Sequence, residues 1–179
     1  MNAIKIEINN SILELLKGDI TKQDTEAVVN AANGRLASGG GVAGAIHRTA
    51  GPGLWKECKK LGGCETGKAK ITSGYDLPNK FVIHTVGPVY SGAKSDPELL
   101  NNSYFNSLKI ADENGIESIS FPALSTGAFG YPVEEAARIA LQTIINYLKT
   151  DTAIKLVRMV LYDSRSYEIH KTILDELGI

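Results

Sequence analysis

Residues 118–162 read SISFPALSTGAFGYPVEEAARIALQTIINYLKTDTAIKLVRMVLY. The apolar run Ser118–Pro122 predicts a buried strand, and Leu156–Tyr162 is rich in the β-branched residues that favour a second strand. Between them, Val133–Tyr147 has the apolar spacing of an amphipathic helix. A strand, a helix and a strand in succession are typical of an α/β fold, in which helices cover a largely parallel sheet.

The alternation of strands and helices extends to both sides of this stretch, with further helices predicted at Glu98–Asn114 and Glu168–Leu177. Hairpin-like pieces near residues 4–16 and 68–86 predict a mixed sheet. The remaining predicted elements are the strands Ile4–Ile8, Ile12–Leu16, Ala27–Asn30, Lys68–Ser73 and Phe81–Val86, and helices from about Gly44 to Thr49 and at Leu54–Leu61. We therefore expect a three-layer α/β/α sandwich around a mixed, largely parallel sheet of about six to seven strands, with residues 1–179 as one domain.

The composition of the 179 residues excludes several classes of protein. The formal net charge is −1, so no basic excess indicates a nucleic-acid partner. No apolar run is long enough to cross a bilayer, and the residues after Met1 contain no signal-peptide core, so we expect a cytoplasmic protein without a membrane partner. Two cysteines, Cys58 and Cys64, and three scattered histidines form no metal-ligand pattern. We expect a monomer that uses no metal and no cofactor.

Two glycine motifs match known nucleotide-binding patterns only in part. Gly39–Gly44 fits the G-x-G-x-x-G pattern of dinucleotide-binding proteins, but residues 31–38 separate it from the preceding predicted strand. No acidic residue ends the next strand, as hydride-transfer enzymes of that class require. Gly62–Lys68 begins like a P-loop, but Ala69 stands where a magnesium-binding Ser or Thr is needed, and a strand follows instead of a helix. Neither classical site is therefore predicted.

A more general kind of phosphate site remains. The consecutive glycines of Gly39–Gly44 expose backbone N–H groups and lead into a predicted helix, whose N-terminus is partially positive. Ser125–Gly130 repeats this arrangement, because it consists of small residues and is followed by Pro132 and the helix from Val133. Two such loops, facing each other, would hold two phosphates with backbone donors alone. The alternative is that each loop only turns a strand into a helix.

Six motifs occur in a fixed order over nearly the whole chain: Gly18-Asp19-Ile20-Thr21, Val28-Val29-Asn30-Ala31-Ala32-Asn33, Gly39-Gly40-Gly41-Val42, Gly44-Ala45-Ile46-His47-Arg48, His84-Thr85-Val86-Gly87-Pro88 and Ser125-Thr126-Gly127-Ala128-Phe129-Gly130-Tyr131-Pro132. Together they resemble the macro domain family, whose members bind ADP-ribose on an α/β/α fold. The flanking segment Leu61-Gly62-Gly63-Cys64 resembles the bacterial MacroD-type group of that family.

The resemblance implies a site for the adenine end of ADP-ribose. Asp19 would accept a hydrogen bond from the exocyclic amine of adenine, and the backbone N–H of Ile20 would read the ring. Tyr162, at the end of a predicted strand, would stack on the adenine. Simpler interpretations remain open, because Asp19 is also a suitable helix N-cap and Tyr162 a suitable aromatic at the edge of the core.

The resemblance also implies a site for the diphosphate and the distal ribose. Phe129 would pack beside the distal ribose, and Asn33 would hydrogen-bond it and fix its anomeric carbon, which makes Asn33 the predicted catalytic residue. The alternative for Asn33 is a turn-forming role, since Asn-Gly is a common turn dipeptide. The diphosphate itself would be held by Gly40, Gly41, Val42, Ser125, Thr126, Gly127, Ala128 and Phe129.

The activity that the resemblance implies is hydrolysis of ester-linked ADP-ribose, either on Asp and Glu side chains of modified proteins or in O-acetyl-ADP-ribose. MacroD-type hydrolases carry an Asp after Gly-Gly-Gly-Val, where this chain has Ala43. A substrate phosphate would then have to activate the water, and His47 is the nearest titratable alternative unless it is a packed structural residue. Ala43 thus leaves open a second function, that of a non-catalytic module that recognises ADP-ribose. Processing of ADP-ribose 1″-phosphate is a further alternative.

Overall fold

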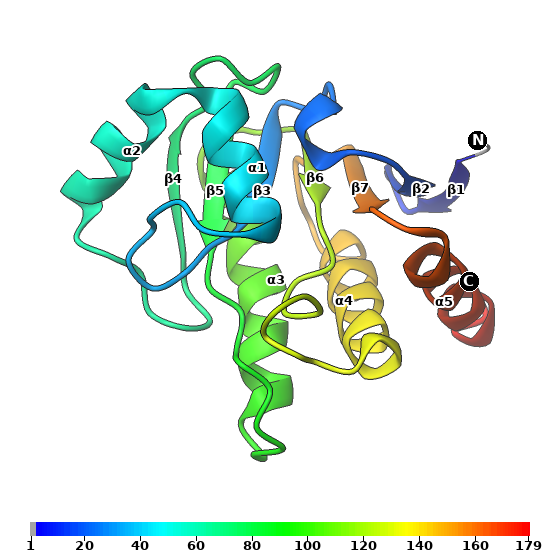
Figure 1. Cartoon of the computed structure of the whole chain (residues 1–179). Helices are drawn as coiled ribbons and strands as arrows, with labels where there is room; N and C mark the ends of the chain where they lie inside the picture. Colours follow the sequence, from blue (N-terminus) through cyan, green and yellow to red (C-terminus); the bar gives the residue numbers. More distant parts are fainter. Residues whose placement is uncertain (1–2) are drawn as a thin grey trace.

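The computed structural model describes residues 3–179, which form one sheet with helices on both sides (Figure 1). The strands are β1 (Ile4–Ile8), β2 (Ser11–Lys17), β3 (Ala27–Ala31), β4 (Ala69–Ser73), β5 (Phe81–Thr85), β6 (Ser118–Phe121) and β7 (Leu156–Leu161). The α-helices are α1 (Gly41–Ala50), α2 (Pro52–Cys58), α3 (Asp96–Glu113), α4 (Val133–Leu148) and α5 (Ser164–Glu176), and two short 3₁₀ helices are η1 (Ile20–Lys22) and η2 (Lys59–Leu61).

The sheet is mixed, as the hairpin-like pieces predicted. Its strand order is β1-β2-β7-β6-β3-β5-β4 over the described residues. The interior pairs, from β2 through β7, β6 and β3 to β5, are all parallel. Both edge strands, β1 and β4, are antiparallel to their neighbours, and each forms a hairpin-like unit with the next strand in the sequence. This arrangement puts the carboxyl ends of β2, β3, β6 and β7 along one edge of the sheet.

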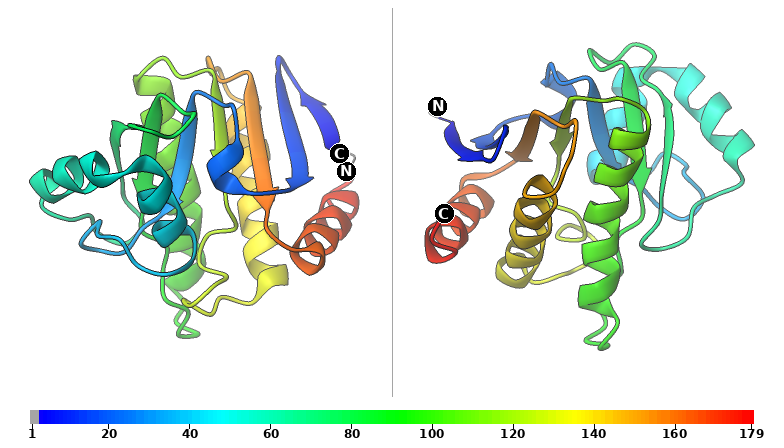
Figure 2. Two further views of the ribbon diagram at one scale, coloured as in Figure 1. Left: turned by 45° about the horizontal axis from the view of Figure 1, so that its top comes forward. Right: turned by 180° about the vertical axis from the view of Figure 1, so that it is seen from behind.

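Helices cover both faces, which confirms the predicted three-layer sandwich. Figure 2 shows α3, α4 and α5 on one face and α1 and α2 on the other. Strand β3 illustrates why two separate apolar cores form: Ala27 and Val29 point toward α3–α5, whereas Val28 points toward α1 and α2. A strand buried on both faces is expected to be apolar throughout, as the central parallel strand of an α/β protein commonly is.

Four helices begin earlier than their apolar patterns predicted: α2 and α3 begin two residues early, at Pro52 and Asp96, and the differences at α1 and α5 are larger. Helix α1 begins at Gly41 instead of near Gly44, because the N–H of Gly44 already donates to the carbonyl oxygen of Gly40 at 3.2 Å. Helix α5 begins at Ser164, four residues before the predicted Glu168. Its N-cap is Asp163, whose carboxylate accepts a hydrogen bond from the N–H of Ser166 at 2.8 Å. The starting points of α1 and α5 are therefore set by glycine geometry and by capping, and not by apolar periodicity.

A buried histidine joins three strands and a helix beneath α1 and α2. His84 on β5 is fully buried, and its Nδ1 lies 3.1 Å from Nδ2 of Asn30 on β3. Its Nε2 lies 2.9 Å from Oγ1 of Thr72 on β4 and 3.7 Å from Sγ of Cys58 on α2. Burial, together with the nearby His47, lowers the pKa of His84 to about 3, so the imidazole is neutral in the folded protein at neutral pH.

We expect the free energy of unfolding to fall as the pH is lowered below about 6.5, the pKa of an unfolded histidine. The folded-state pKa of His84 is lower than that value, so the unfolded chain takes up the proton first and the stabilisation is complete only at higher pH. One such site contributes a slope of at most about 1.4 kcal/mol per pH unit. Burial also lowers the pKa values of His47 and His170, which act in the same direction.

Urea unfolding at pH 7.5, 6 and 5 measures this dependence. The variant His84→Gln removes one proton-binding group, so its stability should change less with pH than that of the parent chain, although its stability at pH 7.5 will be lower. Equal unfolding free energies for the parent chain at pH 7.5 and pH 5 would contradict the expectation.

Candidate functional site

A cleft of about 690 Å³ lies at the carboxyl ends of β2, β6 and β7 and beside the start of α1. Figure 1 shows the loop before α4, the start of α1 and the end of β7 on this same side of the molecule. This is the edge at which open α/β sheets bind their ligands. The lining residues are Gly18, Asp19, Ile20, Gly41, Val42, Ala45, Arg48, Pro122, Ala123, Thr126, Gly127, Val133, Val160, Tyr162, Asp163, Arg165 and Ser166.

The first glycine loop leaves the N-terminus of α1 open. Its N-cap is Gly40, which has no side chain to accept a hydrogen bond from the first turn. The earliest helical N–H groups therefore have no partner within the helix and are available to an anion. The loop can fold this way only because position 44 is a glycine. A Cβ there would lie 2.3 Å from the carbonyl oxygen of Gly39, which is too close for a carbon atom.

The second loop, between β6 and α4, is held in a compact turn. Ser125 is buried and adopts a left-handed φ of 66°, which is rare for a residue other than glycine. Its hydroxyl lies against Gly87, where a Cβ would be 2.2 Å from the Ser125 oxygen. The carbonyl oxygen of Ser125 accepts a hydrogen bond from the N–H of Tyr131 at 2.9 Å. The turn leaves Gly127 and Ala128 exposed at its tip, and Gly127 lines the cleft.

Asp19 and Tyr162 lie together at one end of the cleft. The N–H of Gly18 donates to the carbonyl oxygen of Leu161 at 2.9 Å, and this bond joins the end of β2 to the end of β7. Oδ1 of Asp19 accepts hydrogen bonds from the hydroxyl and the N–H of Thr21, at 2.6 and 2.9 Å, which lower the pKa of the carboxyl group. Asp19 is thus the N-cap of η1, and its second oxygen remains available. The ring of Tyr162 is 84% exposed and offers a flat face for stacking.

The side chain of Asn33 stabilises the turn after β3, in addition to the catalytic role predicted for it. Its Oδ1 accepts hydrogen bonds from the N–H groups of Arg35 and Ala37, both at 3.1 Å. Its Nδ2 donates to the carbonyl oxygen of Ala37 at 2.8 Å, and the same nitrogen would lie 3.6 Å from a Cβ at Gly39. The side chain therefore shapes the turn after β3 and reaches the first glycine loop. One hydrogen of Nδ2 remains for a ligand.

The cleft lining includes neither position 43, where MacroD-type hydrolases carry Asp, nor His47, the alternative base. Ala43 is buried in the first turn of α1 and carries no polar atom. His47 is also buried, its Nε2 has no hydrogen-bond partner, and burial lowers its pKa. Neither residue lines the cleft.

The cleft contains part of the predicted site. The predicted residues that line it are Asp19, Ile20, Gly41, Val42, Thr126, Gly127 and Tyr162. The predicted residues outside its lining are Asn33, Gly40, Ser125, Ala128 and Phe129, which belong to the same loops. The roles assigned to all of these residues stay predictions.

Two arginines that line the cleft were not among the site residues predicted from the sequence. Arg48 is exposed and extends over Gly44, since its Nη1 would lie 3.0 Å from a Cβ there. The spacing of four residues between Gly44 and Arg48 could have indicated that Arg48 lies beside the glycine loop, because such residues share one face of a helix. Arg165 is exposed in the first turn of α5, three residues after Tyr162. These side chains add positive charge to a site that was expected to use backbone donors alone.

The helices and the potential ligand side chains of residues 3–179 bear on two further classes of site. No helix there is both long and apolar enough to cross a membrane. In the same residues, no three His, Cys, Asp or Glu side chains are grouped so that they would hold a metal ion.

The model of the family described as "Macro domain" matches residues 29–140 of this chain. The chain is 48% identical over 175 residues to a macro domain-containing protein of Methanosarcina mazei, which covers 97% of this chain and 94% of that protein. It is 47% identical over 178 residues to the ADP-ribose glycohydrolase MACROD2 of Xenopus laevis. That match covers 96% of this chain but only 43% of the length of the relative.

Solved structures agree with these matches. The Oceanobacillus iheyensis macrodomain with ADP superposes with a TM-score of 0.96 at 46% identity, over 99% of this chain and 97% of that one. The Trypanosoma brucei macrodomain in complex with ADP-ribose superposes with a TM-score of 0.86 at 40% identity, over 90% of this chain and 68% of that one.

Proposed function

This chain belongs to the macro domain family, and we propose that it binds ADP-ribose and hydrolyses ester-linked ADP-ribose. Its substrates would be proteins mono-ADP-ribosylated on Asp or Glu, O-acetyl-ADP-ribose, or both. Each of these presents an acyl group on the distal ribose, so one site serves both. We propose further that the protein acts in the cytoplasm as a monomer.

The observation that carries the proposal is the set of groups that line one cleft. Asp19 and Tyr162 lie at one end and suit an adenine, because a carboxylate accepts from an amine and an exposed ring stacks on a base. Next to them, the uncapped start of α1 and the turn at Gly127 offer backbone N–H groups to a diphosphate. Arg48 supplies a cation on the same wall. A volume of about 690 Å³ is within the range of small-molecule sites.

The relatives support both halves of the proposal. The solved macrodomains of Oceanobacillus iheyensis and Trypanosoma brucei hold ADP and ADP-ribose, and they share 40–46% of their residues with this chain. MACROD2 is named an ADP-ribose glycohydrolase, which supports a hydrolase of ADP-ribosyl groups. The ester linkage is our finer proposal, and it comes from the resemblance to the MacroD-type group.

Hydrolysis in this site needs a positioned water and no enzymic carboxylate beside it. That water would be held between the start of α1 and Asn33, and a phosphate oxygen of the bound substrate would accept a proton from it. The water adds across the ester, which yields a free carboxylate and a ribose hydroxyl. The role of the protein is then to orient the water and the reacting ribose, and orientation alone supplies large rate factors.

A reader module is the second candidate, and Ala43 is the residue that favours it. The carboxylate found at this position in MacroD-type hydrolases is missing, and the nearest titratable group, His47, is buried away from the cleft. A module of this kind would bind ADP-ribosylated proteins with the same contacts and release them unchanged.

We expect this protein to release radiolabelled ADP-ribose from a mono-ADP-ribosyltransferase that has modified its own acidic residues. A hydrolase frees the label with multiple turnovers, whereas a reader only retains the labelled protein. The assay needs a known ester hydrolase as a positive control and calorimetry with ADP-ribose on the same protein sample. Binding without release would establish the reader, and the absence of both would contradict either function.

A further inference from the structure

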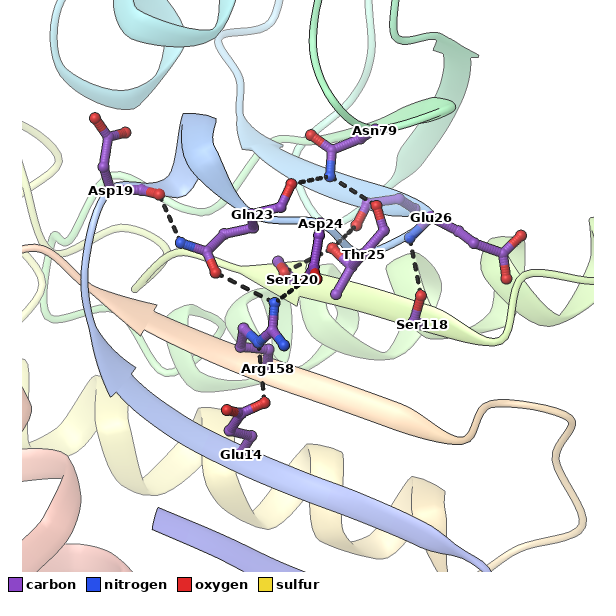
Figure 3. A network of polar contacts seen from close by, with 11 residues as sticks. Glu14, Asp19, Gln23, Asp24, Thr25, Glu26, Asn79, Ser118, Ser120 and Arg158 are labelled. Atoms are coloured by element: carbon purple, nitrogen blue, oxygen red, sulfur yellow. Dashed lines mark hydrogen bonds and ion pairs between the residues drawn. The ribbon is translucent and has the colours of Figure 1, made fainter. Parts of the chain in front are cut away.

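The turn that carries Asp19 is connected to the sheet by buried polar side chains (Figure 3). Arg158 lies on β7, on the face of the sheet opposite α3–α5, and its side chain is only 14% exposed. Its Nε donates to Glu14 on β2 at 3.0 Å. Its Nη1 donates to the carboxylate of Asp24 at 2.7 Å and to the side-chain oxygen of Gln23 at 3.3 Å.

Gln23 connects Arg158 to Asp19. The side chain of Gln23 is buried, and its Nε2 donates to the backbone carbonyl oxygen of Asp19 at 2.7 Å. If the amide were reversed, its NH₂ group would face the guanidinium, which can only donate, and its oxygen would face a carbonyl oxygen. Arg158 therefore fixes which way the Gln23 amide points. Figure 3 shows the carboxylate of Asp19 directed away from this contact.

The contact with Gln23 also fixes the next N–H group. The carbonyl of Asp19 and the N–H of Ile20 belong to one planar peptide unit and point in opposite directions. A donor that holds this carbonyl on the sheet side therefore holds the N–H of Ile20 toward the opposite side, and Ile20 lines the cleft. The remaining bond to the carbonyl comes from the N–H of Lys22 at 3.1 Å, within the 3₁₀ turn itself.

The segment does not depend on the Gln23 side chain for its attachment to the sheet. Asn79 donates through Nδ2 to the backbone carbonyl oxygens of Gln23 and Thr25, at 3.0 and 2.8 Å. The hydroxyl of Thr25 is also hydrogen-bonded to that of Ser120 on β6 at 2.7 Å. Loss of the Gln23 amide would thus free one peptide unit and leave the segment in place.

We propose that Gln23, oriented by Arg158, is a positioning residue that sets the preference of the site for adenine by aiming the Asp19–Ile20 peptide unit. The inference rests on the proposed binding of ADP-ribose at this end of the cleft. Gln23 touches no ligand in this scheme. It acts through the N–H of Ile20, which has to face a ring nitrogen that accepts a hydrogen bond.

The test compares two ligands by calorimetry: ADP-ribose and its hypoxanthine counterpart. In the latter, a carbonyl oxygen replaces the exocyclic amine and the adjacent ring nitrogen carries a proton, so neither Asp19 nor the Ile20 N–H finds its partner. We expect the parent protein to prefer ADP-ribose by at least about tenfold. Gln23→Leu should weaken the binding of ADP-ribose about tenfold and leave the binding of the hypoxanthine ligand nearly unchanged, so that the preference falls by about tenfold.

A second variant and a matched control complete the design. Gln23→Glu keeps the shape and the contact with Arg158 but donates no hydrogen bond to the Asp19 carbonyl, so it should lose the preference as well. Asp24→Asn changes a neighbouring partner of Arg158 that is 89% exposed and does not contact the Asp19 turn. Arg158 keeps its bonds to Glu14 and Gln23 in this variant, so this control should keep the preference of the parent protein.

The outcomes separate the inference from the proposed function. Failure of the parent protein to bind ADP-ribose would overturn both. If the parent protein binds ADP-ribose but Gln23→Leu and Gln23→Glu retain its preference, the proposed function stands and the positioning role is wrong. An equal loss of affinity for both ligands would likewise overturn it, since that result indicates a general disturbance of the cleft.

Discussion

Replacement of Gly44 with alanine is expected to weaken ADP-ribose binding at least about 100-fold, the size of roughly two lost hydrogen bonds to a charged group. The added Cβ would lie 2.3 Å from the carbonyl oxygen of Gly39, closer than a carbon atom approaches a carbonyl oxygen. That oxygen belongs to the backbone and cannot rotate away alone. The glycine loop would have to move, and its N–H groups would leave the position in which they face the diphosphate.

The helix itself should tolerate the change, because alanine favours a helix interior over glycine by up to about 1 kcal/mol. A loss of binding without a loss of stability in urea would therefore indicate a displaced loop. Gly34→Ala is the matched control in the same connection between β3 and α1, since its Cβ would make an ordinary 3.7 Å contact with the Cys64 carbonyl oxygen. Parent-like affinity in Gly44→Ala would remove the glycine loop from the binding site.

The strands and helices follow from local patterns in most of the chain. Helix α4, predicted at Val133–Tyr147, is found at Val133–Leu148, because its apolar spacing is strong and Pro132 precedes it. The start of α1 was misplaced for a physical reason. Three consecutive glycines have low helix propensity, and only the close approach of Gly44 to Gly39 closes the first turn. Local sequence does not reveal such an approach.

The two phosphate loops could be predicted from their glycines and the helices that follow them, but the adenine end of the site could be predicted only through the family motifs. Asp19 and Tyr162 are far apart in the chain, and they meet because β2 and β7 pair in parallel. No periodicity predicts that pairing, because strand order is a property of the whole sheet. Gln23 and Arg158 were missed for the same reason, since each is an ordinary polar residue until the fold buries them together. The family motifs predicted the loops of the site. The residues that orient those loops come together only when the strands pair in the folded protein.

Replacement of Asn33 with alanine is expected to lower kcat for release of ester-linked ADP-ribose by roughly 10- to 1000-fold, the scale for loss of one positioning donor. The affinity for ADP-ribose should fall only a few-fold, because the adenine and diphosphate contacts remain. The structure gives this residue two tasks: it holds its own turn through Arg35 and Ala37, and its Nδ2 reaches the first glycine loop. In the proposed reaction, either task would act at the distal ribose, where the orientation of the reacting groups sets the rate.

Steady-state kinetics, with ADP-ribose affinity and urea unfolding measured on the same sample, separates these possibilities. A lower kcat with nearly unchanged affinity and stability supports a role for Asn33 in the transition state. A matching loss of affinity would indicate instead that the turn after β3 has carried the glycine loop out of place. A kcat within twofold of the parent value would remove Asn33 from the mechanism. The water would then have to be oriented by other donors of the cleft, such as the backbone N–H groups at the start of α1.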